Sequence, residues 1–385
     1  NTKYGSISGY KYEDADNSDE TTTDRTPVSG WTIILKDKDG VEIKRTTTNA
    51  SGYYEFTGLL PADYIVTEGL QVGWIVLIGA SKNVTLDAGE KEENVNFVNV
   101  KLGSIKVLKN VDKNGDGDLE DSVDVIGSSE WNWTLNGTNA GATGTTKSDL
   151  EPGTYTIKET GGLDNYHFVS LTCTGAASER IPITGDTAKI DLRSGEDVVC
   201  TYTNARNLGK LIIEKEVIND NGGSKKATNF SFQIGSEDPI QFTQNGENEL
   251  LGRNEYTRYA GLSYTITEVE ANQDGYTTTY NNCENIVVPH NGEVICKITN
   301  NDVAPTLTVI KNVVNDNGGT AIINDFGIKL NNDLITFGEG VVEGATTIYT
   351  STPTIVSNTE YTLSEEDLAG YEEGTWSCVE NLATV

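Results

Sequence analysis

Lysine, glutamate and asparagine recur in this sequence in an order and at a spacing that could form a covalent crosslink. A five-residue frame, Tyr-x-aliphatic-x-Glu, occurs four times and ends at Glu68, Glu159, Glu268 and Glu365. Upstream of each frame lies a strand-like run that carries one lysine, namely Lys11, Lys109, Lys215 or Lys311. Downstream of the first three frames, another strand-like run ends in Asn99, Asn204 or Asn300.

Each of these polar residues ends an apolar row that would face a core, because side chains alternate across a strand. In the run before Lys109, for example, Ile105 and Val107 lie on the same face as the lysine. Burying an unpaired lysine or glutamate is costly, so we expect the three polar residues of a repeat to meet. The alternative is that the lysine and the asparagine are solvated at the rim of their domain.

A meeting of these three side chains predicts a self-directed crosslinking reaction. A lysine that is desolvated in an apolar core loses its proton easily and becomes a nucleophilic amine. A buried glutamate with a raised pKa can transfer protons while the amine attacks the asparagine carboxamide and ammonia leaves. An isopeptide bond between the first and last strands remains. Because this reaction happens once and uses no external substrate, we do not expect the chain to be an enzyme.

The spacing of the repeat predicts the domain organisation. Lysine and asparagine are separated by roughly 90 residues in each repeat, which is the size of one β-sandwich. Short strand-like runs alternate with turns rich in Gly, Asn and Asp. We therefore expect an all-β chain of tandem immunoglobulin-like sandwiches at 1–100, 101–207, 208–303 and 304–385. The joins are only a few residues long, which predicts a stiff rod.

Composition argues against several classes of function. The 385 residues carry 58 acidic and 28 basic side chains, and the formal net charge of −30 repels nucleic acid. No apolar run approaches the roughly 20 residues of a membrane helix. The sequence contains no Met, which predicts a mature chain whose N-terminus was removed on secretion. The two histidines, His167 and His290, are far apart, so hydrolytic triads and histidine metal sites are poorly supported.

The fourfold pattern resembles the prealbumin-like B-type repeats of collagen adhesins and pilins on Gram-positive cell surfaces. Their crosslinking pattern is an opening-strand lysine, a Tyr-x-aliphatic-x-Glu strand and a closing Thr-Asn strand, and the resemblance covers nearly the whole chain. Residues 30–68 are similar to the calcium-binding B repeats of staphylococcal surface proteins, which often lack the crosslink. The resemblance implies three trios: Lys109–Asn204 with Glu159, Lys215–Asn300 with Glu268, and Lys11–Asn99 with Glu68.

Four of the five cysteines fall into two pairs, Cys173 with Cys200 and Cys283 with Cys296, and one member of each pair lies on a closing strand. Two disulfides between adjacent strands fit an oxidising, extracellular setting, with buried reduced thiols as the alternative. Cys378 is left over, and by the repeat its partner would lie beyond Val385. We therefore expect the fourth domain to lack its closing strand. Continuation of the chain, which we favour, or another subunit would supply that strand.

An acidic loop after the second opening strand predicts a calcium site. Its oxygen-bearing side chains are Asp112, Asn114, Asp116, Asp118 and Asp121. This spacing lets one loop wrap a cation that takes about six to eight oxygen ligands. The twelfth-position glutamate of an EF-hand is absent, because that position is Val123. Asp14 and Asp16 occupy corresponding positions in the first domain, and a solvated acidic turn is the alternative in both loops.

Together these features predict an extracellular or cell-surface structural protein. We expect a stalk or fibre subunit that is stiffened by internal crosslinks and disulfides and assembles head to tail. Its partners would be other copies of itself or other surface proteins. One alternative is a ligand-binding adhesin tip, which an exposed aromatic or apolar patch on the first domain would favour. Another is a set of accessory modules of a larger secreted enzyme, which requires a catalytic domain elsewhere.

Overall fold

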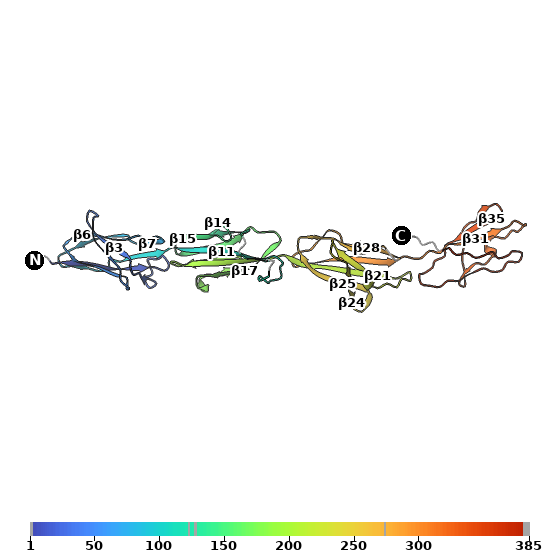
Figure 1. The fold of residues 1–385 in the computed structure, drawn as a ribbon, viewed down its shortest axis with the longest axis horizontal. Coiled ribbons are helices and arrows are strands. Elements are labelled where there is room, and N and C mark those ends of the chain that lie inside the picture. Colours follow the sequence, from blue (N-terminus) through green and yellow to red (C-terminus); the bar gives the residue numbers. More distant parts are fainter. Residues whose placement is uncertain (1–2, 122–123, 127–128, 273–274, 380–385) are drawn as a thin grey trace. The chain divides into compact units, whose positions relative to one another are not determined.

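The computed structural model describes residues 3–121, 124–126, 129–272 and 275–379. The chain divides into two compact units, Asn1–Asn207 and Leu208–Val385. Figure 1 shows the chain as strands joined by loops. Each unit contains two sets of β-sheets, and each set has its own hydrophobic core. We call these sets the first to fourth domains in chain order. Within the described ranges, no helix is long and apolar enough to cross a bilayer.

The first domain is a sandwich of two sheets. One sheet has the order β2–β1–β10–β7, with β5 and β9 also paired to β1, and the other has the order β4–β3–β6–β8. Ile7, Phe56 and Phe97 of the first sheet share one buried core with Ile33 and Val66 of the second. The strands are β1 (Gly5–Glu13), β2 (Thr26–Pro27), β3 (Thr32–Asp37), β4 (Glu42–Thr47), β5 (Tyr53–Leu59), β6 (Ala62–Glu68), β7 (Trp74–Ile78), β8 (Ser81–Leu86), β9 (Lys91–Glu92) and β10 (Phe97–Lys101).

The second domain repeats this plan. Its sheets have the orders β12–β11–β20–β17, with β15 paired to β11, and β14–β13–β16–β19–β18. Val107 and Tyr202 of one sheet meet Trp133 and Ile157 of the other in the core. The elements are β11 (Gly103–Asp112), β12 (Val125–Ile126), β13 (Asn132–Leu135), β14 (Thr138–Ala142), β15 (Thr146–Leu150), β16 (Gly153–Thr160), β17 (Tyr166–Thr174), the 3-10 helix Ser178–Arg180, β18 (Ile183–Thr184), β19 (Thr187–Leu192) and β20 (Asp197–Arg206).

The third domain has one large sheet and two small ones. Their orders are β24–β25–β21–β30–β28, β23–β22–β27 and β26–β29. Ile213 and Ile298 of the large sheet share a core with Phe232 and Ile266. The elements are β21 (Leu208–Ile218), the 3-10 helix Ala227–Asn229, β22 (Ser231–Ile234), β23 (Ile240–Gln241), β24 (Gln244–Asn245), β25 (Asn248–Tyr259), β26 (Ser263–Tyr264), β27 (Ile266–Glu268), β28 (Tyr276–Asn281), β29 (Ile286–Val287) and β30 (Glu293–Asp302).

The fourth domain has two sheets of three strands, in the orders β31–β35–β34 and β33–β32–β36. Its core of buried residues is Val313, Ile323, Phe326 and Ile328. The elements are β31 (Val309–Val314), the 3-10 helix Ile323–Asp325, β32 (Lys329–Leu330), β33 (Asp333–Leu334), β34 (Val341–Glu343), β35 (Thr346–Ser351) and β36 (Leu363–Ser364).

The first and last strands of each of the first three domains pair in parallel. These pairs are β1 with β10, β11 with β20, and β21 with β30. Burial alternates along β11 and β20, so one face of each strand lies in the core while the other is more exposed. The first and last strands of a domain, although far apart in sequence, therefore place their core-facing side chains next to each other.

Candidate functional site

The register of the parallel pairs brings each lysine close to its asparagine. In the third domain, Lys215 lies opposite Ile298 and Val217 lies opposite Asn300. In the second domain, Lys109 lies opposite Tyr202 and Val111 lies opposite Asn204. The asparagine is thus two residues beyond the position that faces the lysine, on the same core-facing side. The first domain has the same offset, with Lys11 opposite Phe97 and Glu13 opposite Asn99.

In the third domain, the trio forms a closed set of contacts. The Lys215 Nζ atom donates to Glu268 Oε2 and to Asn300 Oδ1. The Asn300 amide donates to Glu268 Oε1 at 2.7 Å, and the hydroxyl of Thr278 donates to the same oxygen at 3.2 Å. The lysine side chain is 0% exposed and lies over the ring of Phe230. Burial lowers the pKa of Lys215 to about 8, although Glu268 opposes this shift.

In the second domain, the glutamate again connects the other two residues. Lys109 Nζ donates to Glu159 Oε1 at 2.5 Å, and the Asn204 amide donates to Glu159 Oε2 at 2.9 Å. The Oδ1 atom of Asn204 is buried without a hydrogen-bond partner. Lys109 is fully buried over the ring of Trp131, and desolvation lowers its pKa to about 8.

The first domain brings its trio together with a different pattern of contacts. Lys11 Nζ pairs with Glu68 Oε2 at 2.8 Å, and the Asn99 amide donates to the same oxygen at 3.1 Å. Desolvation lowers the pKa of Lys11 to about 8 and raises the pKa of Glu68. The ammonium lies over the ring of Trp31, and the Asn99 Oδ1 atom is buried without a hydrogen bond.

These three sites share the features that an acyl transfer between side chains requires. An amine with a lowered pKa is more often in its neutral, nucleophilic form. A carboxylate lies between the amine and the amide nitrogen, so it can move a proton from one to the other. In each site the lysine side chain is fully buried beside an aromatic ring, which keeps bulk water from competing as the nucleophile. The arrangement is suited to forming one bond between Lys Nζ and Asn Cγ.

The fourth domain contains the lysine and the glutamate of this set. Lys311 Nζ donates to Glu365 Oε1 and lies over the ring of Phe326. In the described part of the chain, no asparagine side chain forms a hydrogen bond with Lys311 or Glu365. The lysine side chain is 15% exposed here, whereas its three counterparts are 0% exposed.

Both predicted disulfides are present. Cys173 bonds to Cys200, directly across the pairing of β17 with β20, and Cys283 bonds to Cys296 of β30. Each disulfide therefore holds the closing strand of its domain, four residues before the asparagine. Cys378 is a free, exposed thiol.

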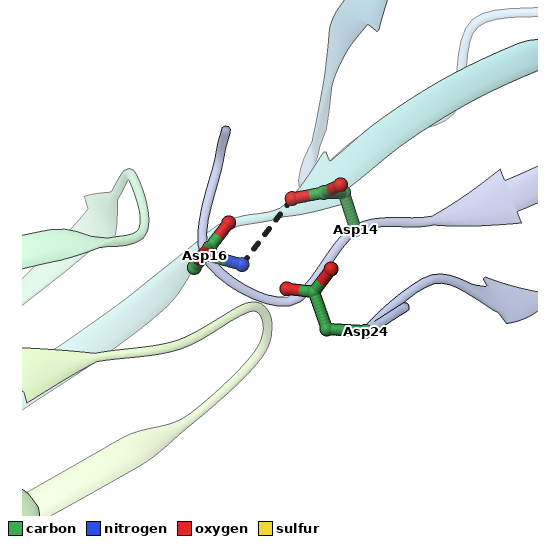
Figure 2. A group of neighbouring side chains, drawn as sticks. All are labelled: Asp14, Asp16 and Asp24. Carbon is green, nitrogen blue, oxygen red and sulfur yellow. Dashed lines mark hydrogen bonds between the residues drawn. The ribbon is translucent and has the colours of Figure 1, made fainter. Parts of the chain in front are cut away.

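The acidic loop of the first domain folds around buried Asp14. One carboxylate oxygen of Asp14 accepts the backbone N–H groups of Asp16 and Ser18, each at 3.3 Å. Figure 2 shows Asp24 facing Asp14 and Asp16 from the other end of the loop, and oxygens of the three carboxylates lie within 4.8 Å of one another. Arg25 Nε binds the second oxygen of Asp14 at 3.1 Å. Desolvation, together with the charge of Asp24, raises the pKa of Asp16.

The second domain gathers Asp112, Asp116 and Asp124 in the same way, with carboxylate oxygens within 4.8 Å of one another. Buried Asp112 accepts the backbone N–H groups of Gly115 and Gly117. Asp124 accepts the Lys113 N–H through one oxygen, and its other oxygen is buried without a partner. The loop thus presents carboxylate oxygens, which Ca²⁺ prefers as ligands.

The other predicted ligands of this loop lie outside that carboxylate group. The Asn114 amide donates to Asp116 and Asp121, and Asp118 caps the N–H of Glu120. Position 123 lies outside the described residues. The sequence reasoning missed Asp24 and Asp124, which lie two residues and one residue before the short strands β2 and β12 that pair with the opening strands. The sequence did contain a signal for these ligands, because an aspartate occurs at the end of each acidic loop, just before the chain pairs again with the opening strand.

Family profiles match the chain along almost its whole length. Residues 5–115 match the SdrD B-like domain, and residues 108–206, 207–300 and 302–385 match prealbumin-like fold domains. The serine-aspartate repeat-containing protein C of Staphylococcus aureus (strain Newman) is 34% identical over 68 residues. That alignment covers 18% of this chain and 7% of the relative, so the chain matches a small part of that protein.

Solved structures resemble the chain at low sequence identity. The Bacillus anthracis TIE protein is 19% identical with a TM-score of 0.36, over 78% of this chain and 51% of that one. BcpA, the major pilin subunit of Bacillus cereus, is 13% identical with a TM-score of 0.27, over 78% of this chain and 100% of that one. On the profile matches, the chain belongs to the proteins built from prealbumin-like, B-type repeat domains that are found in surface adhesins and pilins.

Proposed function

We propose that this chain is a structural subunit of a secreted, cell-surface stalk or fibre, and that Lys–Asn isopeptide bonds lock its domains. The observation that carries the proposal is the buried glutamate that contacts both a lysine and an asparagine in the first three domains. Three buried ionisable pairs at equivalent positions would be a costly way to hold a fold together without a further role.

The bond would form by attack of the neutral lysine Nζ on the Cγ atom of the asparagine. The amine loses a proton to the glutamate, and the amide nitrogen of the asparagine gains one as it leaves. The Nζ–Cγ bond forms, the Cγ–Nδ2 bond breaks and ammonia departs. The carboxylate of Glu268 is in contact with both nitrogen atoms, Lys215 Nζ and Asn300 Nδ2, which suits it to this transfer.

Such bonds would suit a protein that bears tension. Lys215 and Asn300 lie on the first and last strands of one domain. A covalent bond between them would carry a pulling force directly from one strand to the other, because the chain between them would be closed into a loop. The disulfide between Cys283 and Cys296 holds the same closing strand. Subunits of this kind would assemble with copies of themselves or with other surface proteins.

We also propose that Ca²⁺ binds the two carboxylate groups, at Asp14, Asp16 and Asp24 and at Asp112, Asp116 and Asp124. In the first domain, the residues on either side of Asp14 hold the second domain. The backbone oxygen of Ala15 accepts the N–H of Ser194 at 2.9 Å, and Glu13 accepts the Ser194 hydroxyl at 2.6 Å. An ion at Asp14 would therefore stiffen the loop of the first domain that contacts the second domain.

Intact mass of the purified chain, before and after reduction, tests the crosslink. Each isopeptide bond removes one ammonia, about 17 Da. Each disulfide returns about 2 Da on reduction. We expect a deficit of two or three ammonias together with two reducible bonds. A reduced mass equal to that of the unmodified sequence would refute the crosslinking proposal.

A further inference from the structure

Thr278 joins the glutamate and the asparagine of the third domain. Its hydroxyl oxygen accepts a hydrogen bond from Asn300 Nδ2 at 3.2 Å, and its hydroxyl group donates to Glu268 Oε1 at 3.2 Å. The same Nδ2 atom donates to the same carboxylate oxygen at 2.7 Å. The three side chains therefore form a closed ring of hydrogen bonds around the nitrogen that the crosslinking reaction would release.

A neighbouring loop residue fixes the direction of the Thr278 hydroxyl. The backbone N–H of Asn272 donates to Thr278 Oγ1 at 3.1 Å, and Asn272 Oδ1 accepts the backbone N–H of Thr278 at 2.7 Å. The hydroxyl oxygen thus accepts hydrogen bonds from Asn272 and from Asn300, which use its two lone pairs. Its single proton is directed to Glu268, so toward the asparagine amide the hydroxyl acts as an acceptor.

Thr278 reaches this site through the pairing of β28 with the closing strand. It lies directly opposite Asn300 in the antiparallel pair of β28 with β30, so the two side chains share one face of the sheet. The corresponding strands of the first and second domains place Val76 and Phe168 opposite their asparagines. Neither of these side chains has a hydroxyl group, so the contact distinguishes the third domain from the other two.

The asparagine amide is oriented differently where this hydroxyl is present. In the third domain, Asn300 Oδ1 accepts a hydrogen bond from Lys215 Nζ. In the first and second domains, the Oδ1 atoms of Asn99 and Asn204 are buried without a hydrogen bond. A turn of the Asn300 amide by 180° would place Oδ1 against two acceptors, the carboxylate and the hydroxyl oxygen, which is unfavourable.

We propose that Thr278 is a positioning residue for the crosslinking step of the third domain, and that its hydroxyl holds the Asn300 amide with its nitrogen toward Glu268 and its carbon open to Lys215. This role rests on the proposed crosslinking function. The Nζ–Cγ bond forms, the Cγ–Nδ2 bond breaks, and Glu268 takes a proton from the amine while the leaving nitrogen gains one and departs as ammonia. Thr278 keeps its own proton and acts on orientation, to which the rate of such a step is sensitive.

The rate of bond formation in newly made chains tests this role. The full chain is made in an oxidising cell-free translation system, and samples are quenched with acid at successive times. Protease peptides that contain Lys215 linked to Asn300 are then quantified by mass spectrometry, and each linked pair is lighter by about 17 Da than its two separate peptides. The bond between Lys109 and Asn204, followed in the same samples, is the internal reference.

Three variants on β28 separate the hydroxyl from the shape of the side chain. Thr278→Val removes the hydroxyl at nearly constant volume and should slow the third-domain bond about 10- to 100-fold, while the second-domain bond keeps its rate. Thr278→Ser keeps the hydroxyl and should restore most of the rate. Thr279→Val is the matched control, because Thr279 is exposed on the other face of the strand, and it should react as the unmodified chain does. The disulfide between Cys283 and Cys296 in each variant confirms that this part of the domain is folded.

The role of Thr278 and the crosslinking function fail in different ways. If the unmodified chain yields no linked peptide from any domain, the crosslinking function is wrong and the role of Thr278 falls with it. If the third-domain bond forms as fast in Thr278→Val as in the unmodified chain, the function stands and the role of Thr278 is wrong. A Thr278→Ser chain as slow as Thr278→Val would also overturn the role, because the hydroxyl would not be the group that matters.

Discussion

Asn300 and Lys215 lie on the last and first strands of the third domain and contact each other, and Glu268 binds both of them. The offset of two residues in the parallel pairing puts the amide carbon beside the amine rather than beside solvent. The second domain has the same offset, but its lysine and asparagine are joined through Glu159 alone. The contact between Lys215 and Asn300 depends on the register of one strand pair, β21 with β30. Few substitutions should therefore disturb it.

Replacing the bridging glutamate should block the crosslink of its own domain and no other. Glu159→Ala removes the group that contacts both Lys109 and Asn204, so the intact mass should rise by about 17 Da beyond the substitution itself. Without the crosslink, Lys109 also remains a buried amine that has no carboxylate partner, so that domain should be less stable than in the unmodified chain.

Glu151→Ala is the matched control, because Glu151 is an exposed glutamate of the same domain. Its mass should change by the substitution alone, and its thermal unfolding should be unchanged. A Glu159→Ala chain that retains the full ammonia deficit would contradict the assigned role of this carboxylate. Glu159→Gln tests the same point with a side chain of nearly equal size.

A buried lysine that has no crosslink should make stability depend on pH. In Asn300→Ala, Lys215 stays an amine, and burial holds its folded pKa at about 8, below the ordinary value of 10.5. Between these values the unfolded chain binds more protons, so the free energy of unfolding should increase as pH rises from about 8 to 10.5. Calorimetry of the third-domain transition at pH 7.5, 9 and 10 should show an increasing unfolding temperature.

The double variant Asn300→Ala with Lys215→Met supplies the baseline for this measurement. It removes the lysine amine from the site and keeps Glu268, so its unfolding temperature should lack the increase above pH 8 that Lys215 causes. If both variants show the same pH profile, Lys215 is not neutral in the folded domain.

The two disulfides should differ in their contribution to stability. They close chain segments of different length, with sequence separations of 27 and 13 residues. In the chain-entropy account, the longer segment gains about 0.6 kcal/mol more, on a typical contribution of about 2–4 kcal/mol. Replacing Cys173 and Cys200 by serine should therefore destabilise more than replacing Cys283 and Cys296. Chemical denaturation of each variant, with the asparagine of that domain changed to alanine, measures this difference; equal losses would contradict it.

The sequence was sufficient to predict the β-sandwich class and the strand periodicity, because both depend on local alternation of apolar residues. It also indicated that Lys109 and Asn204 face the same core. It did not predict which aromatic ring covers the lysine, since Trp131 lies before β13, a strand that belongs to the other sheet. Nor did it predict Asp24 and Asp124, because their approach depends on how β2 and β12 fold back to pair with the opening strands β1 and β11.

Calcium binding discriminates between the ligands inferred from sequence and those gathered by the fold. If Asp124 is a ligand, Asp124→Asn should weaken Ca²⁺ binding in a calorimetric titration more than Asp118→Asn, because Asp118 lies outside the carboxylate group. At a free Ca²⁺ concentration of about 100 times the dissociation constant, the bound domain should gain about 2.7 kcal/mol of stability, and EDTA should remove that gain. Asp39→Asn, at an exposed aspartate, should bind as the unmodified chain does. Equal effects of Asp118→Asn and Asp124→Asn would show that the ion follows the linear loop pattern instead of the folded carboxylate group.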